Sequence, residues 1–423
     1  MSKNFQYEKL EPYVFVTKLA GFEHTKYIQG VATHQPEADT DIPMVQGKNI
    51  RKGFFVPEHE WFISKSVSDA LPRSVLDKPC ILIPYVGSNL GEVGVFPHNY
   101  RCHLASNIAK VELVSEKYSL EYLKYYLQSD VGQGYLFQSK QGSAQPNITM
   151  ESIRNTLIIE RSRSEQQRIC DVLSAIDQKF LLNEKMCAEL EAMSKTLYDY
   201  WFTQFDFPNA DGKPYRSSGG EMIWNDQLKR EIPKGWGVGN LYSIADPING
   251  LACQKYRPRE NEAALPVVKI KEMHEGITAD TESVSINIPT KHKIFDGDIL
   301  FSWSATLEVM YWFGGNAGLN QHIFKVVPIN GYSKEYVYHQ FSAYVINFVK
   351  MAEARKTTMG HITTDHLDQS RIVLPPAEVI KTFSEIVAPI HEKIGHCRKE
   401  NRELTKLRDW LLPMLMNGQA KVE

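Results

Sequence analysis

The sequence predicts an α+β protein made of two related copies of a mixed α/β-sheet block, each followed by a long helix. Two segments carry apolar residues at alternating steps of four and three positions, as in a helix that packs along another helix. These residues are Ile169, Leu173, Ile176 and Phe180 in the first segment, and Phe383, Val387, Ile390 and Ile394 in the second. Each residue of the second segment lies 214 positions after its counterpart, as 383 − 169 shows. The pattern therefore occurs twice in the same register.

The repeat extends well beyond these two segments. With the same offset, "YSLEYL" from Tyr118 matches "YSKEYV" from Tyr332. Further upstream the offset drifts through small insertions, so that "CILIPYVGS" from Cys80 resembles "DILFSWSAT" from Asp298. Self-similarity over roughly 200 residues indicates a tandem duplication of a globular block and not a solenoid of short repeats.

Local signals place the expected elements. Short β-rich runs such as "PCILIPYV" and "GDILFSW" alternate with Gly, Pro and Asn turns, and a Ser-capped helix follows in each copy. The first long helix is expected to begin with a capping box at Ser164 and Gln167, and to end near Phe205. In the second long helix we expect a kink or a break at Pro389, and an end at Pro413.

Neither long helix is expected to be stable alone, because its apolar stripe would face water. Each is the obvious partner of the other, and the stripe continues through Leu190, Leu197, Leu404 and Leu411. One asparagine falls in each stripe, Asn183 in the first and Asn401 in the second. These residues either fix the register of a helix pair or simply turn to solvent.

Composition sets the class of protein. The chain has 423 residues, 43% hydrophobic and 23% charged, which is typical of a soluble globular protein of two or three domains. We expect neither a signal peptide nor a membrane span, since no basic and apolar leader or long apolar run occurs. Six scattered cysteines suit the reducing cytoplasm, where they act as small buried hydrophobes. With a net charge of −2, any surface that binds a polyanion must be local.

Three features together resemble the DNA-specificity subunit of type I restriction–modification systems. "GSAQPNITMESIRNTLIIERSRSEQQRICDVL", with Glu165-Gln166-Gln167, is similar to the family's passage from a recognition domain into its first conserved helix. "IPKGW" (232–236) is similar to the entrance of the second recognition domain, and the duplicated layout covers nearly the whole chain. The chain departs from the family in two places. The first block lacks the "PKGW" entrance, and "PPAEVIKTF" replaces Glu-Gln-Gln at the second helix.

The resemblance implies two target-recognition domains separated by a pair of long antiparallel coiled-coil helices with pseudo-twofold symmetry. Each domain would read one half of a split, asymmetric site in double-stranded DNA, and the helix pair would set the spacer. The expected parts are target-recognition domain 1 (1–162), the first helix (163–206), a linker (207–231), target-recognition domain 2 (232–376), the second helix (377–417) and a tail (418–423).

The resemblance also implies partners. Two adenine-methyltransferase (modification) subunits and the restriction/translocase subunits would bind this chain. The chain itself would hold no cofactor or metal, while S-adenosylmethionine and ATP with Mg²⁺ would bind in those partners. The methyltransferase would have to flip the adenine that it modifies.

Candidate DNA contacts are basic, amide and hydroxyl residues in turn-rich segments at matching places in both copies. Lys and Arg neutralise phosphates, and Asn, Gln and Arg can contact base edges; each residue taken alone also fits a solvated loop. In the first copy they are Lys48, Asn49, Arg51, Lys52, Ser88, Asn89, Gln145 and Asn147. In the second copy they are Lys269, Lys271, His274, Ser304, Thr306, Asn320, Gln321, His322, Arg355, Lys356, Thr357 and His361.

Two other functions remain as rivals. An enzyme, either a nuclease or a methyltransferase, would need a catalytic motif, but the chain has no P-loop and no Asn/Asp-Pro-Pro-aromatic loop. Neither "HITTDH" (361–366) nor "DGDIL" (296–300) has convincing metal or nuclease spacing. A coiled-coil adaptor without DNA specificity would explain the helices but not the two related, divergent blocks.

Overall fold

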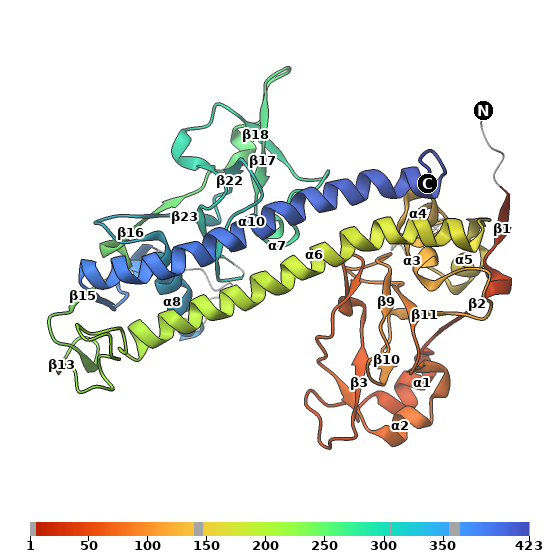
Figure 1. Ribbon diagram of the computed structural model, residues 1–423, viewed down its shortest axis with the longest axis horizontal. Coiled ribbons are helices and arrows are strands. Elements are labelled where there is room, and N and C mark those ends of the chain that lie inside the picture. Colours follow the sequence, from red (N-terminus) through yellow and green to blue (C-terminus); the bar gives the residue numbers. More distant parts are fainter. Residues whose placement is uncertain (1–5, 139–146, 305, 355–363, 423) are drawn as a thin grey trace. The chain divides into compact units, whose positions relative to one another are not determined.

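The computed structural model describes residues 6–138, 147–304, 306–354 and 364–422 (Figure 1). The chain forms two compact units, the first from Met1–Gln178 with Leu404–Glu423 and the second from Lys179–Glu403. Its two longest helices, α6 (Arg163–Tyr198) and α10 (Ala377–Met416), contribute residues to both units. The units therefore divide within the long helices and not at their ends.

The first unit contains two four-stranded sheets and two small strand pairs. One sheet has the order β2 (Val14–Lys18), β11 (Ile108–Leu113), β8 (Cys80–Pro84) and β9 (Gly94–Phe96). The other has the order β6 (Phe62–Ile63), β3 (Ile42–Val45), β10 (Cys102–Leu104) and β7 (Val75–Leu76). The pairs are β1 (Tyr7–Lys9) with β12 (Leu157–Ile159), and β4 (Ile50–Arg51) with β5 (Phe54–Phe55).

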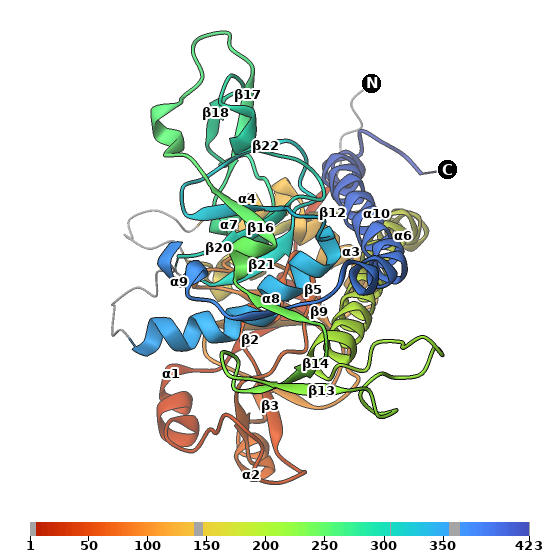
Figure 2. The same cartoon turned by 90° about the vertical axis from the view of Figure 1, so that its left-hand side faces the viewer.

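The second unit repeats the two four-stranded sheets and the first of the strand pairs (Figure 2). One sheet has the order β16 (Ala245–Asn249), β23 (Ile323–Pro328), β20 (Ile299–Ser302) and β21 (Glu308–Tyr311). The other has the order β18 (Ser283–Ser285), β17 (Ala264–Val268), β22 (Ala317–Leu319) and β19 (Lys293–Ile294). The pairs are β15 (Gly237–Gly239) with β24 (Ile372–Leu374), and β13 (Met222–Asn225) with β14 (Arg230–Pro233).

Strand directions confirm the duplication that the sequence predicts. In each unit one sheet is antiparallel throughout, and the other joins its two central strands in parallel. The parallel pair is β3 with β10 in the first unit and β17 with β22 in the second. The strands predicted from "PCILIPYV" and "GDILFSW" occupy the same third place, as β8 and β20.

Short helices complete each block. The predicted serine caps are confirmed, because Ser119 accepts from the Tyr122 amide ahead of α3 (Leu120–Gln128) at 3.1 Å, and Ser333 accepts from the Tyr336 amide at 3.2 Å. The other helices of the first unit are α1 (Gly21–Glu23), α2 (Lys65–Asp69), α4 (Asp130–Leu136) and α5 (Met150–Asn155). Those of the second are α7 (Ile270–Glu275), α8 (Lys334–Ala354) and α9 (Thr364–Asp368).

The long helices differ from the sequence prediction in three details. The capping box of α6 lies two residues earlier than predicted, because Ser162 and Glu165 bond each other's amides at 3.3 and 3.1 Å. The final π turn of α6, Asp199–Thr203, ends close to the predicted end near Phe205. No break occurs at Pro389, and α10 continues past Pro413 to Met416. Pro389 and Glu385 both face solvent, so water can bond the carbonyl that the proline leaves without a donor.

The apolar stripes of the long helices pack in two ways. Near the start of each helix they enter the core of its own block, Ile169 and Leu173 in the first unit and Phe383 and Val387 in the second. Within the second unit the middle of each stripe meets the other helix in a cluster of Cys187, Ile390, Ile394 and Cys397. All six cysteines of the chain are buried and unpaired. None of the described helices is both long and apolar enough to cross a membrane.

The two stripe asparagines meet inside the second unit. Asn183 donates to Asn401 Oδ1 at 2.9 Å and to Glu400 at 2.7 Å. Asn401 donates to Glu184 at 2.8 Å and to the Phe180 carbonyl at 3.2 Å. They do not turn to solvent, since Asn183 is 1% and Asn401 5% exposed. A buried polar layer of this kind favours one register, because any shift leaves its amides without partners.

We expect the two asparagines to be energetically coupled. Asn183→Leu or Asn401→Leu alone strands a buried amide and should lower the free energy of unfolding by about 1–2 kcal/mol. The double variant should recover most of this loss, giving a coupling of about 2 kcal/mol in urea denaturation. Lys185→Ala, on an exposed position of α6, should change stability by less than about 0.5 kcal/mol. If the double variant loses as much free energy of unfolding as the two single variants together, the two asparagines do not form a shared layer.

Candidate nucleic-acid interface

The most basic predicted segment of the first unit is a hairpin, here called the basic hairpin (residues 47–55). Its strands β4 and β5 are joined by Lys52 and Gly53, which have φ angles of +53° and +82°. Arg51 and Lys52 are exposed. Arg51 donates to the Lys48 carbonyl at 2.8 Å and pairs with Glu58 at 3.0 Å, and Lys48 pairs with Glu60. The turn therefore presents cations held by local contacts.

Asn49 plays a different part in this hairpin. It is 1% exposed, and its side chain donates to the carbonyls of Val56 at 2.9 Å and Glu58 at 2.8 Å while accepting from the Gln46 amide at 2.8 Å. The side chain thus shapes the base of the hairpin from inside.

The structure brings three predicted segments of the first unit together. Asn89 donates to the Ile50 carbonyl at 2.7 Å, and exposed Ser88 donates to Asn89 at 2.8 Å. Exposed Asn147 precedes Ile148, whose amide donates to the Tyr85 carbonyl at 3.0 Å. Predicted Gln145 lies outside the described residues.

In the second unit the predicted cations lie around α7. Lys269 pairs with Glu282 at 2.5 Å, Lys271 with Glu275 at 3.7 Å, and His274 with Glu308 at 3.2 Å. Exposed pairs of this kind are weak, so phosphate could compete with the carboxylates for the two lysine ammonium groups.

The other predicted residues of this unit gather where β17 and β22 end. The Asn320 amide donates to the Val268 carbonyl at 3.1 Å, and the Trp303 amide donates to the His322 carbonyl at 3.3 Å. Gln321 Nε2 lies 3.3 Å from His322 Nε2. Ser304 and Asn320 are buried, whereas Thr306 is exposed. Arg355, Lys356, Thr357 and His361 lie outside the described residues.

Four further residues join these groups without having been selected from sequence. Lys18 Nζ lies 4.5 Å from the centre of the Tyr85 ring in the first unit. In the second, Trp303 Nε1 donates to Asn249 Oδ1 at 3.4 Å. The only sequence signal for Lys18 was its basic side chain at the end of the segment that forms β2. Nothing in the sequence marked Asn249.

Each block is fixed to the long helices by a buried polar junction. In the first unit Asp177 on α6 accepts from Lys124 and Tyr125 of α3, both at 2.8 Å, and Arg408 of α10 lies 3.8 Å away. Burial and the Asp177 carboxylate raise the pKa of Tyr125, which keeps its hydroxyl protonated as a donor.

The second unit has a neutral junction at the same positions. With the offset of 214, Asp177 corresponds to His391, Tyr125 to His339 and Arg408 to Ser194. Ser194 Oγ lies 2.5 Å from His339 Nε2 and 2.8 Å from His391 Nε2. His391 Nδ1 lies 3.0 Å from the Tyr311 hydroxyl.

Both imidazoles of this junction are held neutral. Burial lowers the pKa of His339 to about 3, helped by His391 and Lys195, and burial lowers that of His391 to about 4 against the opposing effect of Glu335. The two junctions therefore join block and helices at equivalent positions with different polar groups, which are ionic in the first unit and neutral in the second.

The two blocks, each with its loops, form a duplicated α/β module. The family described as the type I restriction modification DNA specificity domain matches residues 31–192 and again residues 233–406. These matches cover most of the chain, so this chain belongs to that family.

Relatives and one solved structure agree with this assignment. The chain is 26% identical over 317 residues to the type I restriction enzyme MjaIX specificity subunit of Methanocaldococcus jannaschii, covering 72% of this chain and 69% of that protein. It is 25% identical over 326 residues to the HindI specificity subunit of Haemophilus influenzae, covering 65% and 71%. The crystal structure of a type I restriction-modification S subunit from M. genitalium matches with a TM-score of 0.53 at 13% identity, covering 98% and 97%. This last likeness supports the fold alone.

We expect the neutral junction to make the second unit sensitive to acid. In the unfolded chain both imidazoles titrate near pH 6.5, whereas in the folded chain their pKa values are lower. The unfolded state therefore binds more protons below pH 6.5, and stability falls as the pH drops from about 6.5 towards 4. At pH 5 the loss should be on the order of 2 kcal/mol per imidazole.

Melting temperatures between pH 5 and 8 test this expectation. His391→Gln should flatten the pH dependence, while His396→Gln, at an exposed position of the same helix, should leave it unchanged. An unaltered slope in His391→Gln would show that other groups dominate the acid sensitivity.

Proposed function

We propose that this chain is the non-catalytic, sequence-specific DNA-binding subunit of a type I restriction–modification complex. The observation that carries the proposal is one topology built twice, with different polar residues at matching loops. Each unit would read one half of a bipartite, asymmetric target, the first through the basic hairpin and its neighbours and the second through the residues around α7 and His322. Basic side chains would bind phosphates, and amides would contact base edges.

The long helices would act as a spacer between the half-sites. We infer an antiparallel coiled pair with pseudo-twofold symmetry, a finer arrangement than the family assignment itself establishes. At 1.5 Å per residue, the 36 residues of α6 span about 54 Å. Half-sites on one face of B-DNA lie about 34 Å apart or a multiple of that distance, so a stiff pair of this length suits the task.

Exposed apolar residues on the long helices favour protein partners. They are Leu181, Leu182 and Met193 on α6, and Ile386, Leu407 and Trp410 on α10. We propose that two adenine-methyltransferase subunits bind these helices in the cytoplasm and that restriction/translocase subunits join the complex through them. S-adenosylmethionine and ATP with Mg²⁺ would bind in those partners and not in this chain.

A methylome comparison tests the proposal. Cells expressing this chain with its methyltransferase should carry methyladenine in both halves of a split motif, which should be absent with the methyltransferase alone. Exchanging one block for that of another family member should change only one half of the motif. Absence of any motif, with both proteins folded, would favour the alternative of a coiled-coil adaptor without DNA specificity.

We expect Lys52 to contribute one phosphate contact. Lys52→Gln should weaken DNA binding by the complex and make the slope of log K against log salt less negative by about 0.9. Lys229 is a suitable control, because it is also exposed at a left-handed turn, with a φ angle of +52°. Lys229→Gln should leave the slope unchanged, and equal effects of the two substitutions would argue against a specific role for the basic hairpin.

A further inference from the structure

The tip of the basic hairpin is held from below by the body of the first unit. The Gly53 amide donates to Glu92 Oε2 at 2.9 Å. Gln128, at the end of α3, donates to the carbonyls of Gly53 at 3.2 Å and Val93 at 2.7 Å. The turn favours glycine at residue 53, because its φ is +82° and a Cβ would lie 2.6 Å from the Gln128 amide nitrogen, which would have to move.

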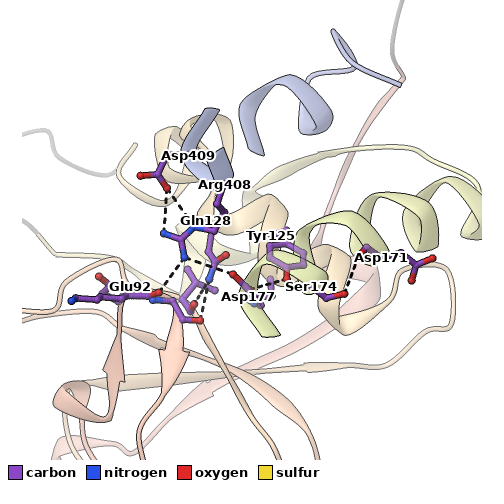
Figure 3. Close-up of polar contacts among 12 residues, drawn as sticks. Glu92, Tyr125, Gln128, Asp171, Ser174, Asp177, Arg408 and Asp409 are labelled. Atoms are coloured by element: carbon purple, nitrogen blue, oxygen red, sulfur yellow. Dashed lines mark hydrogen bonds and ion pairs between the residues drawn. The ribbon is translucent and has the colours of Figure 1, made fainter. Parts of the chain in front are cut away.

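Helix α10 holds the same tip from another direction. Arg408 Nη1 donates to the Lys52 carbonyl at 3.4 Å. The same guanidinium donates to Asp409 Oδ1 at 3.2 and 3.4 Å (Figure 3). Its Nη1 also lies 3.8 Å from Asp177, the buried carboxylate of the ionic junction. A guanidinium can serve three acceptors at once because its donors point in fixed, different directions.

Apolar contacts hold the strands of the hairpin, where Ile50 is buried and Phe55 packs against the same core. An open pocket of about 280 Å³ lies between the hairpin and the helix, lined in part by Lys52, Gly53, Glu92, Gln128 and Arg408. At the turn itself, hydrogen bonds reach the backbone of Lys52 and Gly53 from Glu92, Gln128 and Arg408. Arg408 provides the one among them that comes from α10.

Among the described residues of the second unit, the position equivalent to Arg408 carries a serine. Position 408 corresponds to Ser194, whose hydroxyl is engaged by two imidazoles. A change at Arg408 should therefore affect the loops of one unit only.

We propose that Arg408 is a positioning residue for DNA recognition by the first unit. By holding the Lys52 carbonyl, it makes the first half-site's specificity depend on a helix that lies 356 positions further along the chain. This inference rests on the proposed function, because it concerns how accurately a DNA-binding hairpin is placed. Sub-ångström placement decides whether a side chain reaches its base edge, so a looser hairpin loses discrimination more than total affinity.

The test compares Arg408→Gln with Arg402→Gln in the full complex with the methyltransferase. Arg402 is a matched control on the same helix, since it donates to the Phe313 carbonyl at 2.9 Å and pairs with Asp296 at 3.5 Å in the second unit. Binding is measured to the cognate duplex and to duplexes with one base pair changed in either half. If Arg408→Gln does not fold, Arg408→Lys repeats the test, keeping the charge but not the fork of donors.

Arg408→Gln should reduce discrimination at the first half-site by at least about five-fold, the lower end of what one base contact supplies, and leave the second half-site unchanged. Arg402→Gln should leave first-half discrimination within about twofold. Unchanged first-half discrimination, or an equal loss in both halves, would overturn the role of Arg408.

Hydrogen exchange gives a readout that does not depend on DNA. The Gly53 amide should exchange at least about tenfold faster in Arg408→Gln than in the original chain, since opening the turn becomes easier. Unchanged exchange overturns the positioning role even where the complex recognises a split motif. Faster exchange in a complex that recognises no motif overturns the proposed function, and with it the assignment of this contact to DNA recognition.

Discussion

The structure depends on how the apolar stripe of each long helix is divided between the core of the helix's own block and the contact with the other long helix. The first turns of the stripe are buried in the helix's own block, where Ile169 and Leu173 join the aromatic core around Tyr122 and Tyr126. Phe383 and Val387 do the same beside Tyr336 and Phe341. An isolated helix of this length would expose that stripe to water, so helix and block stabilise each other. A rigid connection follows, because neither can rotate without opening a core.

The core of the first unit is complete only when the C-terminal part of α10 packs into it. Leu412 and Leu415 of α10 belong to the same core as Ile169, and Arg161 donates to the carbonyls of Leu415 and Met416 at 3.0 and 3.2 Å. These carbonyls are among those that a helix leaves unpaired at its end, so Arg161 caps α10 from the base of α6. Forming a contact between residues 254 positions apart has a large cost in loop-closure entropy. Completion of this unit is therefore expected late in folding.

The sequence predicted the features that repeat and missed those that depend on side-chain direction. Periodicity and the 214-residue offset gave the duplication, the long helices and the serine caps, because these follow from local spacing. The capping box was misplaced by two residues, since Ser162 and Ser164 offer the same hydroxyl and only the chain's path selects one. Pro389 suggested a kink or a break, and the helix has no break; the sequence does not reveal that this side of α10 faces solvent. Among the candidate DNA contacts, Asn49 and Asn320 are buried, and their polar character alone did not distinguish a loop-shaping residue from an exposed one.

The two junctions show why such residues escape pattern analysis. Asp177 is compatible with burial only because Lys124 and Tyr125 face it, and His391 only because Ser194 and Tyr311 do. Replacing Asp177 by the histidine of the other copy would leave the Lys124 ammonium buried without its carboxylate, which is the costly way to break an ion pair. The positions in each junction must therefore change together, although they are dispersed along the chain. The two units share one backbone topology, but each junction has its own set of polar side chains, and the members of each set pair with one another.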